Sequence, residues 1–96
     1  MKSEFHPAAE QELAAAVKLG ERRSAGLGGE LLTEAERITE LLCEAPKIGE
    51  PIDARHRRFP MRRFPFAFIY RVDGDVLRVI ALSHRRQRPG YWRGRV

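Results

Sequence analysis

Two apolar runs separated by a short acidic turn constrain the fold of this chain more than any other feature. Residues 66–72 read FAFIYRV, residues 76–84 read VLRVIALSH, and Asp73-Gly74-Asp75 lies between them. Asp-Gly is a favoured pair for the two-residue type I′ turn of a β-hairpin. The sequence therefore predicts two antiparallel strands joined by a turn at Asp73-Gly74.

This turn would also fix which residues share a face of the hairpin, because directly opposed residues lie on the same side. It sets Val72 opposite Asp75 and Tyr70 opposite Leu77. One face is then apolar, with Phe66, Phe68, Tyr70, Leu77, Val79 and Ala81. The other face mixes apolar side chains with cations: Ala67, Ile69, Val76, Ile80, Leu82, Arg63, Arg71, Arg78 and His84. Such a mixed face is unusual for surface exposed to solvent, and we expect it to receive a partner.

Two helices are predicted before the hairpin. Residues 6–23 (HPAAEQELAAAVKLGERR) place Pro7 at a first helical position and repeat apolar residues at helical spacing. A second helix is predicted over residues 27–44, where one face carries Leu31, Ala35, Ile38 and Leu42. The glycines of GLGG follow no strand, so we expect the turn of a helical hairpin there and no dinucleotide site.

The remaining segments complete the order of elements. Residues 1–5 (MKSEF) form a strand that must pair with a later one, residues 47–58 (KIGEPIDARHRR) are a loop, and Pro60 lies in a short edge or interrupted strand. The sequence thus predicts an α+β fold, β-α-α-β-β-β, with the helical hairpin on one face of a small, mainly antiparallel sheet. Ninety-six residues are expected to form a single domain, residues 1–96.

Composition argues against several classes of protein. No apolar run approaches the length of about 18 residues that a membrane span needs, and no signal peptide is apparent. The single cysteine, Cys43, excludes an intramolecular disulfide and fits a reducing cytoplasm; we expect it to be an apolar, at least half-buried residue. No acidic cluster accompanies a histidine, so neither a metal nor a cofactor is expected.

Charge is divided unevenly along the chain. Residues 1–48 hold six Lys or Arg and nine Asp or Glu, whereas residues 49–96 hold twelve Arg, no Lys and four Asp or Glu. A one-sided basic field attracts phosphates or acidic proteins without identifying either. The excess of arginine is compatible equally with guanidinium chemistry and with a GC-rich genome.

Several stretches of the chain are similar to the RelE/ParE superfamily of bacterial toxins. They are FHPAAEQEL near the start, Pro46 after the second helix, and RRFPFAFIYRVDGDVLRVIALSHRRQRPGYWRGR at the end. The most specific parts are Arg63-Phe64-Pro65-Phe66, Tyr70, and the ending His84-x-Arg86-x-x-Pro89-x-Tyr91-Trp92-x-x-Arg95. The resemblance covers essentially the whole chain, is closest to the ParE-like, plasmid-stabilisation branch, and implies the same order of elements.

The resemblance also implies a type II toxin encoded beside an antitoxin whose toxin-binding segment is acidic. Such a segment could lie across the basic half of the chain, with arginines pairing its carboxylates. The candidate contacts for antitoxin or target are Arg57, Arg63, Arg71, Arg78, Arg85, Arg86, Arg88, Trp92 and Arg95.

The superfamily divides by target. ParE-like members are associated with inhibition of DNA gyrase and need no active site, whereas RelE-like members resemble ribosome-dependent ribonucleases that use Lys, Arg and a C-terminal Tyr. No Lys follows Lys47, so part of the RelE-like pattern is missing. We therefore expect a growth inhibitor that acts on DNA gyrase without catalysis.

Two alternatives stay open. In a ribosome-dependent mRNA endonuclease, His84 would be the general acid or base, Arg63 and Arg86 would hold the phosphate, and Tyr91 would carry a second proton. We expect instead that these residues are structural, with Tyr91 and Trp92 folded back onto apolar surface. A nucleic-acid-binding domain that stacks bases on Tyr91 and Trp92 is the third possibility.

Overall fold

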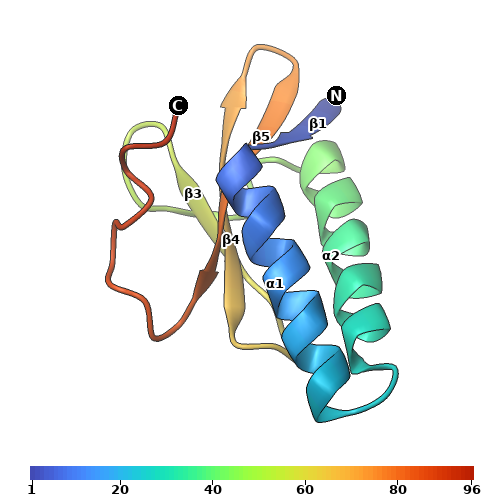
Figure 1. Cartoon of the computed structure of the whole chain (residues 1–96). Coiled ribbons are helices and arrows are strands. Elements are labelled where there is room, and N and C mark those ends of the chain that lie inside the picture. The colour runs from blue at the N-terminus through green and yellow to red at the C-terminus, as the bar shows by residue number, and fades with distance from the viewer.

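The computed structural model describes residues 1–96 and has two helices against one face of a five-stranded sheet (Figure 1). The elements are β1 (Lys2–Phe5), α1 (Pro7–Arg23), α2 (Leu27–Glu44), β2 (Glu50–Pro51), β3 (Arg57–Pro60), β4 (Phe66–Asp73) and β5 (Val76–His84). The strand order is β1-β5-β4-β3-β2, with β1 parallel to β5 and all other pairs antiparallel. The predicted α+β fold is confirmed, and the two-residue β2 is an addition within the segment expected to be a loop. Neither helix has the length and apolarity that crossing a membrane requires.

The main core lies between the helices and the sheet. The predicted apolar face of α2 is confirmed, since Leu31, Ala35, Ile38 and Leu42 are all buried. Cys43 is half-buried at the margin of the same core, as expected. The buried members of this core are Ala9, Ala16, Leu31, Ala35, Ile38, Leu42, Met61, Phe68, Tyr70, Leu77, Val79 and Leu82.

The β4–β5 hairpin differs from the predicted register by two residues. The loop is Gly74-Asp75, so that Asp73 lies opposite Val76 and Val72 opposite Leu77. Gly74 has a φ of +63° and Asp75 has no positive φ. A single left-handed glycine at the first loop position is typical of a type II′ turn and does not fit the type I′ turn expected. Because the slip is two residues, the side chains next to the turn keep the faces predicted for them.

A β-bulge changes the faces farther from the turn. The register shifts between Ile69 and Tyr70, which leaves Ile80 as an extra residue on β5. As a consequence, Leu82 packs into the main core, and Ala81 lies with Ile69 and Ile80 on the opposite side of the sheet. The predicted faces of Ala81 and Leu82 were wrong because the bulge reverses the alternation after Ile80. The sequence of the strand gives no indication of where a bulge will occur.

The two helices approach closely at Gly28, in the first turn of α2. The Glu21 carboxylate of α1 accepts hydrogen bonds from the backbone N–H groups of Gly26 (2.8 Å) and Gly28 (3.0 Å). This arrangement satisfies donors that a helix start leaves free, and it places a negative charge where the helix dipole favours one. A Cβ on Gly28 would lie 2.5 Å from the carbonyl oxygen of Val17.

Substituting Gly28 by alanine is therefore expected to lower the free energy of unfolding by about 1–3 kcal/mol, the usual cost of overpacking. Gly29→Ala is the matched control, because a Cβ at Gly29 meets nothing within 4 Å. That control should be neutral or stabilising by up to about 1 kcal/mol, since alanine favours helix more than glycine does. Urea unfolding followed by circular dichroism measures both. Equal stabilities of the two variants would contradict the close approach of the helices at Gly28.

Candidate functional site

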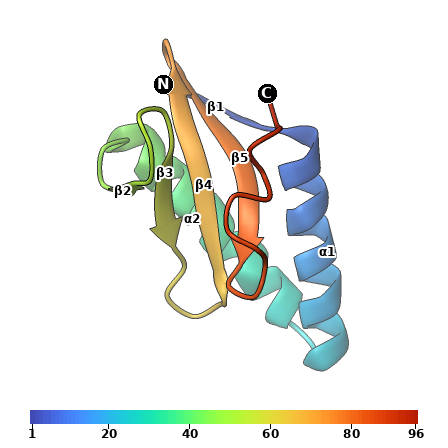
Figure 2. The same cartoon turned by 90° about the vertical axis from the view of Figure 1, so that its left-hand side faces the viewer.

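The segment after β5 crosses the face of the sheet opposite the helices (Figures 1 and 2). Trp92 is only 4% exposed and packs against Ile69, Ile80 and Ala81, with Tyr91 beside them. The expected fold-back of Tyr91 and Trp92 is thus confirmed. The apolar part of the mixed face receives the chain's own C-terminal segment, which explains why that face is apolar.

Glu12 of α1 holds this segment in place. Its Oε1 accepts hydrogen bonds from the backbone N–H of Leu82 (3.0 Å) and from Arg95 Nη1 (2.9 Å). Its Oε2 accepts from the Tyr91 hydroxyl (2.7 Å) and from Arg95 Nη2 (2.9 Å). Arg95 Nη1 also donates to the carbonyl of Ile80 (3.0 Å). We call Glu12, Tyr91 and Arg95 the tail anchor.

The tail anchor also completes the edge of the sheet. β1 pairs with β5 only as far as Val79, so the later residues of β5 have no neighbouring strand on that side. Unpaired backbone groups that are shielded from water are costly. Glu12 bonds the N–H of Leu82, and Arg95 bonds the C=O of Ile80, so these two side chains take the place of the missing strand.

Burial and the hydrogen bond to Glu12 together raise the pKa of Tyr91 to about 12. The phenol therefore stays protonated throughout the neutral range, and its proton is donated to the Glu12 carboxylate. A hydroxyl in this state contributes a structural hydrogen bond and is not ionised at neutral pH.

Tyrosine ionisation offers a direct measurement of this environment. The folded-state pKa of Tyr91 is about 12 against an ordinary value of 10.0, so the neutral phenol is favoured by folding. Its contribution to stability is complete below about pH 10 and is lost as the pH rises towards 12. Burial also raises the pKa of Tyr70, the other tyrosine. Tyrosinate absorbance should therefore appear well above pH 10 in the folded protein and near pH 10 in urea. A folded-state titration at pH 10 would contradict the buried tail anchor.

His84 ends β5 and lies on the helix side of the sheet. Its ring packs edge-on against Phe66, with 5.2 Å between the centroids, and lines a small cavity with residues such as Leu19 and Leu31. Its Nδ1 accepts a hydrogen bond from the backbone N–H of Arg86 (3.0 Å), which leaves the proton of a neutral ring on Nε2. The expectation that His84 lies on the mixed face was wrong, because the bulge reverses the faces of the residues after Ile80.

Arg63 was expected on the mixed face, and it does not lie there. It is in the loop between β3 and β4, and its Nη1 forms an ion pair of 2.9 Å with Glu30 near the start of α2. No hydrogen bond or ion pair joins Arg63 to His84, Arg86 or Tyr91. The backbone contact between Arg86 and His84 is the one direct hydrogen bond among these four candidates for nuclease chemistry, which are therefore not assembled into one site.

The arginines predicted to contact a partner fall into two groups. The first group is bound within the chain: Arg78 to Glu4 (2.8 Å), Arg71 to Asp73 (2.8 Å), Arg63 to Glu30, Arg95 to Glu12, and Arg57 to the carbonyls of Lys47 and Gly49. The second group is exposed, follows β5 and has side chains without a hydrogen bond or ion pair: Arg85, Arg86 and Arg88.

Sequence reasoning missed both acidic residues that hold the tail. No local sequence pattern pointed to Glu12, because its partner Arg95 is 83 positions away along the chain. Asp53 forms an ion pair with Arg93 (2.7 Å) and accepts from the backbone N–H groups of Arg55 (2.8 Å) and His56 (2.7 Å). These bonds hold the pKa of Asp53 well below its usual value. The Asx turn in PIDARH was the available local signal for Asp53.

Comparison with known proteins agrees with the fold. The family model described as "ParE toxin of type II toxin-antitoxin system, parDE" matches residues 4–89. A solved structure titled "Chromosomal ParDE TA system from P. aeruginosa" has the same fold, with 16% identity, a TM-score of 0.64, and coverage of 88% of this chain and 95% of that chain. No curated protein matches the chain. The predicted resemblance is confirmed, and the chain belongs to the ParE toxin family of type II toxin–antitoxin systems.

Proposed function

We propose that this toxin inhibits bacterial growth by binding DNA gyrase in the cytoplasm, without cleaving RNA, and that an acidic antitoxin encoded beside it neutralises it. The observation that carries the choice of target is the state of Tyr91. A ribonuclease of the alternative kind needs groups that gain and lose protons near neutral pH. Tyr91 has a pKa of about 12 and donates its proton to Glu12.

The surroundings of His84 support the same choice. Its Nδ1 is occupied by the backbone of Arg86, and its ring lines an apolar cavity at the ends of the helices. Tyr91 by contrast is bound to Glu12 of α1 and packs beside Trp92 on the other side of the sheet. An acid and a base that act on one phosphodiester must both reach it, and these two side chains have no contact that would bring them together.

The antitoxin contact is supported by Arg85, Arg86 and Arg88. These side chains are exposed and have no hydrogen bond or ion pair within the chain, so their donors are free for carboxylates. Arginine binds carboxylates through two parallel hydrogen bonds, and a cluster of like charge speeds the encounter with an acidic partner. Trp92, which we expected among these contacts, does not belong to this surface, because it is only 4% exposed and packs against Ile69, Ile80 and Ala81.

The test is an assay of plasmid supercoiling by purified DNA gyrase, in which we expect the protein to block the reaction. His84→Asn should inhibit equally, because an asparagine oxygen can accept the hydrogen bond that Nδ1 now accepts. The same two proteins are compared on translating ribosomes. Cleavage of ribosome-bound mRNA by the natural chain, lost in His84→Asn, together with unimpeded supercoiling, would overturn the proposal in favour of the endonuclease.

A further inference from the structure

An apolar cavity of about 100 Å³ lies between the helical hairpin, the start of β4 and the end of β5. These parts of the chain lie at the same end of the molecule in Figures 1 and 2. The cavity is open to solvent beside Leu19, which is 47% exposed. We call it the helix-end pocket, and its walls include Leu19, Leu27, Leu31, Phe64, Phe66 and His84.

The volume of the helix-end pocket suits one aliphatic side chain. An apolar cavity of about 150 Å³ holds one benzene molecule. A volume of about 100 Å³ therefore has room for a side chain such as that of leucine, but not for a nucleobase, which is larger than benzene. Cavities for drug-sized ligands are larger still, at about 300–1,000 Å³. The size and the apolar lining together favour a single side chain of a protein partner.

One polar donor in the wall of the pocket has no partner. His84 Nδ1 accepts the backbone N–H of Arg86 (3.0 Å), so the proton of the neutral ring is on Nε2. No acceptor of the chain bonds Nε2. The half-buried ring is fixed edge-on against Phe66, with 5.2 Å between the centroids. Nε2 is thus available to a carbonyl or carboxylate oxygen next to a bound side chain.

Unbound cations surround the helix-end pocket. Arg23 lines it, and Arg85 and Arg86 follow His84 directly. All three arginines are exposed, and their side chains have no hydrogen bond or ion pair within the chain. The backbone N–H of Arg85 donates to the carbonyl of Pro65 in the lining (2.9 Å), which keeps this residue beside the pocket.

The carboxylates of the same region are already engaged. Glu21 accepts the backbone N–H groups of Gly26 and Gly28, and Glu30 pairs with Arg63 at 2.9 Å. The free guanidinium groups beside the pocket therefore attract a negatively charged partner.

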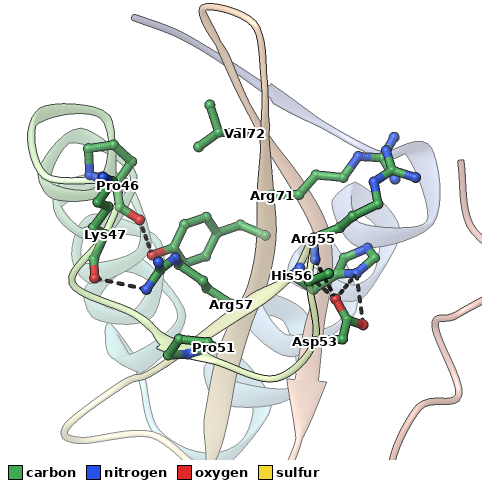
Figure 3. A pocket seen from close by; sticks show the side chains of 11 residues that line it. Pro46, Lys47, Pro51, Asp53, Arg55, His56, Arg57, Arg71 and Val72 are labelled. Carbon is green, nitrogen blue, oxygen red and sulfur yellow. Dashed lines mark hydrogen bonds and ion pairs between the residues drawn. The ribbon is translucent and has the colours of Figure 1, made fainter.

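A larger cavity of about 350 Å³ beside β4 does not offer this combination (Figure 3). Two arginines of its lining are bound within the chain. Arg57 donates to the carbonyls of Lys47 (3.1 Å) and Gly49 (2.8 Å), and Arg71 donates to Asp73 (2.8 Å). The helix-end pocket instead joins an apolar interior to cations that are unbound.

We propose that the helix-end pocket binds an acidic segment of a protein partner, with one aliphatic side chain in the cavity and carboxylates paired to Arg23, Arg85 and Arg86. A side chain buried in a pocket supplies most of the affinity, and the charges around it supply orientation and a fast encounter. A nucleic-acid backbone would match the arginines but has no group for the apolar interior. The inference rests on the proposed neutralisation by an acidic antitoxin, and it names the place where the antitoxin binds.

The experiment is an NMR titration of the ¹⁵N-labelled full chain with a heptapeptide of glutamates that has leucine at its centre, at constant ionic strength. We expect saturable shifts in residues 19–31, 64–66 and 84–86. A heptapeptide with serine in place of leucine should bind about tenfold more weakly or worse, since it buries no aliphatic side chain. Equal affinity of the two peptides would overturn the proposal. Tighter binding of a single-stranded oligothymidylate at the same residues would overturn it in favour of nucleic acid.

Leu19→Glu places a carboxylate at the mouth of the pocket and should weaken binding of the leucine peptide about tenfold or more. Leu32→Glu is the matched control, because Leu32 has a similar exposure of 39%, lies on α2 and is outside the lining. The spectra of the free variants show whether each is folded. A loss in Leu32→Glu as large as that in Leu19→Glu would contradict docking at this pocket.

The protein encoded beside the toxin is tested separately against the natural chain and both variants. Weaker binding to Leu19→Glu than to Leu32→Glu is the expected result. Equal binding to both variants would overturn the role of the pocket and leave the antitoxin itself in place. Absence of any binding would overturn the antitoxin of the proposed function, while the peptide titration still decides whether the pocket takes an acidic segment.

Discussion

Replacing Trp92 by alanine is expected to lower the free energy of unfolding by about 3–5 kcal/mol, the usual loss for a buried tryptophan. Trp92 fills the second apolar cluster with Ile69, Ile80 and Ala81 and is 4% exposed. Its removal would uncover that face of the sheet and release the segment that crosses it. Since Trp92 is the only tryptophan, unfolding in urea is followed by circular dichroism.

Trp92→Phe is the control for this experiment. A phenyl ring keeps most of the apolar contact with Ile69 and Ile80, so the loss should be clearly smaller than in Trp92→Ala. If Trp92→Ala costs less than about 1 kcal/mol, the C-terminal segment contributes little to the folded domain and the structural role given to it is wrong.

Glu12→Ala is expected to cost about 3 kcal/mol. The substitution leaves the N–H of Leu82 without its acceptor and Arg95 without its counter-ion, and both losses occur in a largely shielded site. Alanine favours helix, so the loss cannot come from the propensity of α1. Trp92 should at the same time become more exposed, which a red shift of its fluorescence would report.

Glu36→Ala is the matched control, because Glu36 is exposed on α2 and has no hydrogen bond or ion pair. Its free energy of unfolding and its Trp92 emission should stay close to those of the natural chain. If Glu12→Ala behaves in the same way as Glu36→Ala, the tail anchor does not hold the C-terminal segment.

The order of elements could be predicted because it depends on local patterns. The face of α2 that carries Leu31 and Ile38 repeats at helical spacing, and the glycines at its start separate it from α1. The turn was predicted in the right place but with the wrong loop residues, since both Asp73-Gly74 and Gly74-Asp75 contain turn-forming residues. A shift of two residues in the pairing leaves each side chain near the turn on the same face. The alternation of apolar residues therefore could not distinguish the two possible loops.

The site was harder to predict because it depends on contacts between distant residues. The bulge at Ile80 moved His84 to the helix side, and the Glu12–Arg95 pair joins opposite ends of the chain. The mixed face suggested a surface for a partner, but Trp92 occupies its apolar part. Among the arginines predicted to contact a partner, only Arg85, Arg86 and Arg88 are both exposed and without a bond within the chain.

The proposed target is tested most directly by pulse-labelling DNA and protein synthesis in a bacterium during the first minutes after expression of the toxin. If DNA gyrase is the target, DNA synthesis falls first and a DNA-damage response follows. Co-expression of the protein encoded beside the toxin should then restore growth. Protein synthesis that collapses before DNA synthesis, or growth that continues unchanged, would rule out gyrase as the target.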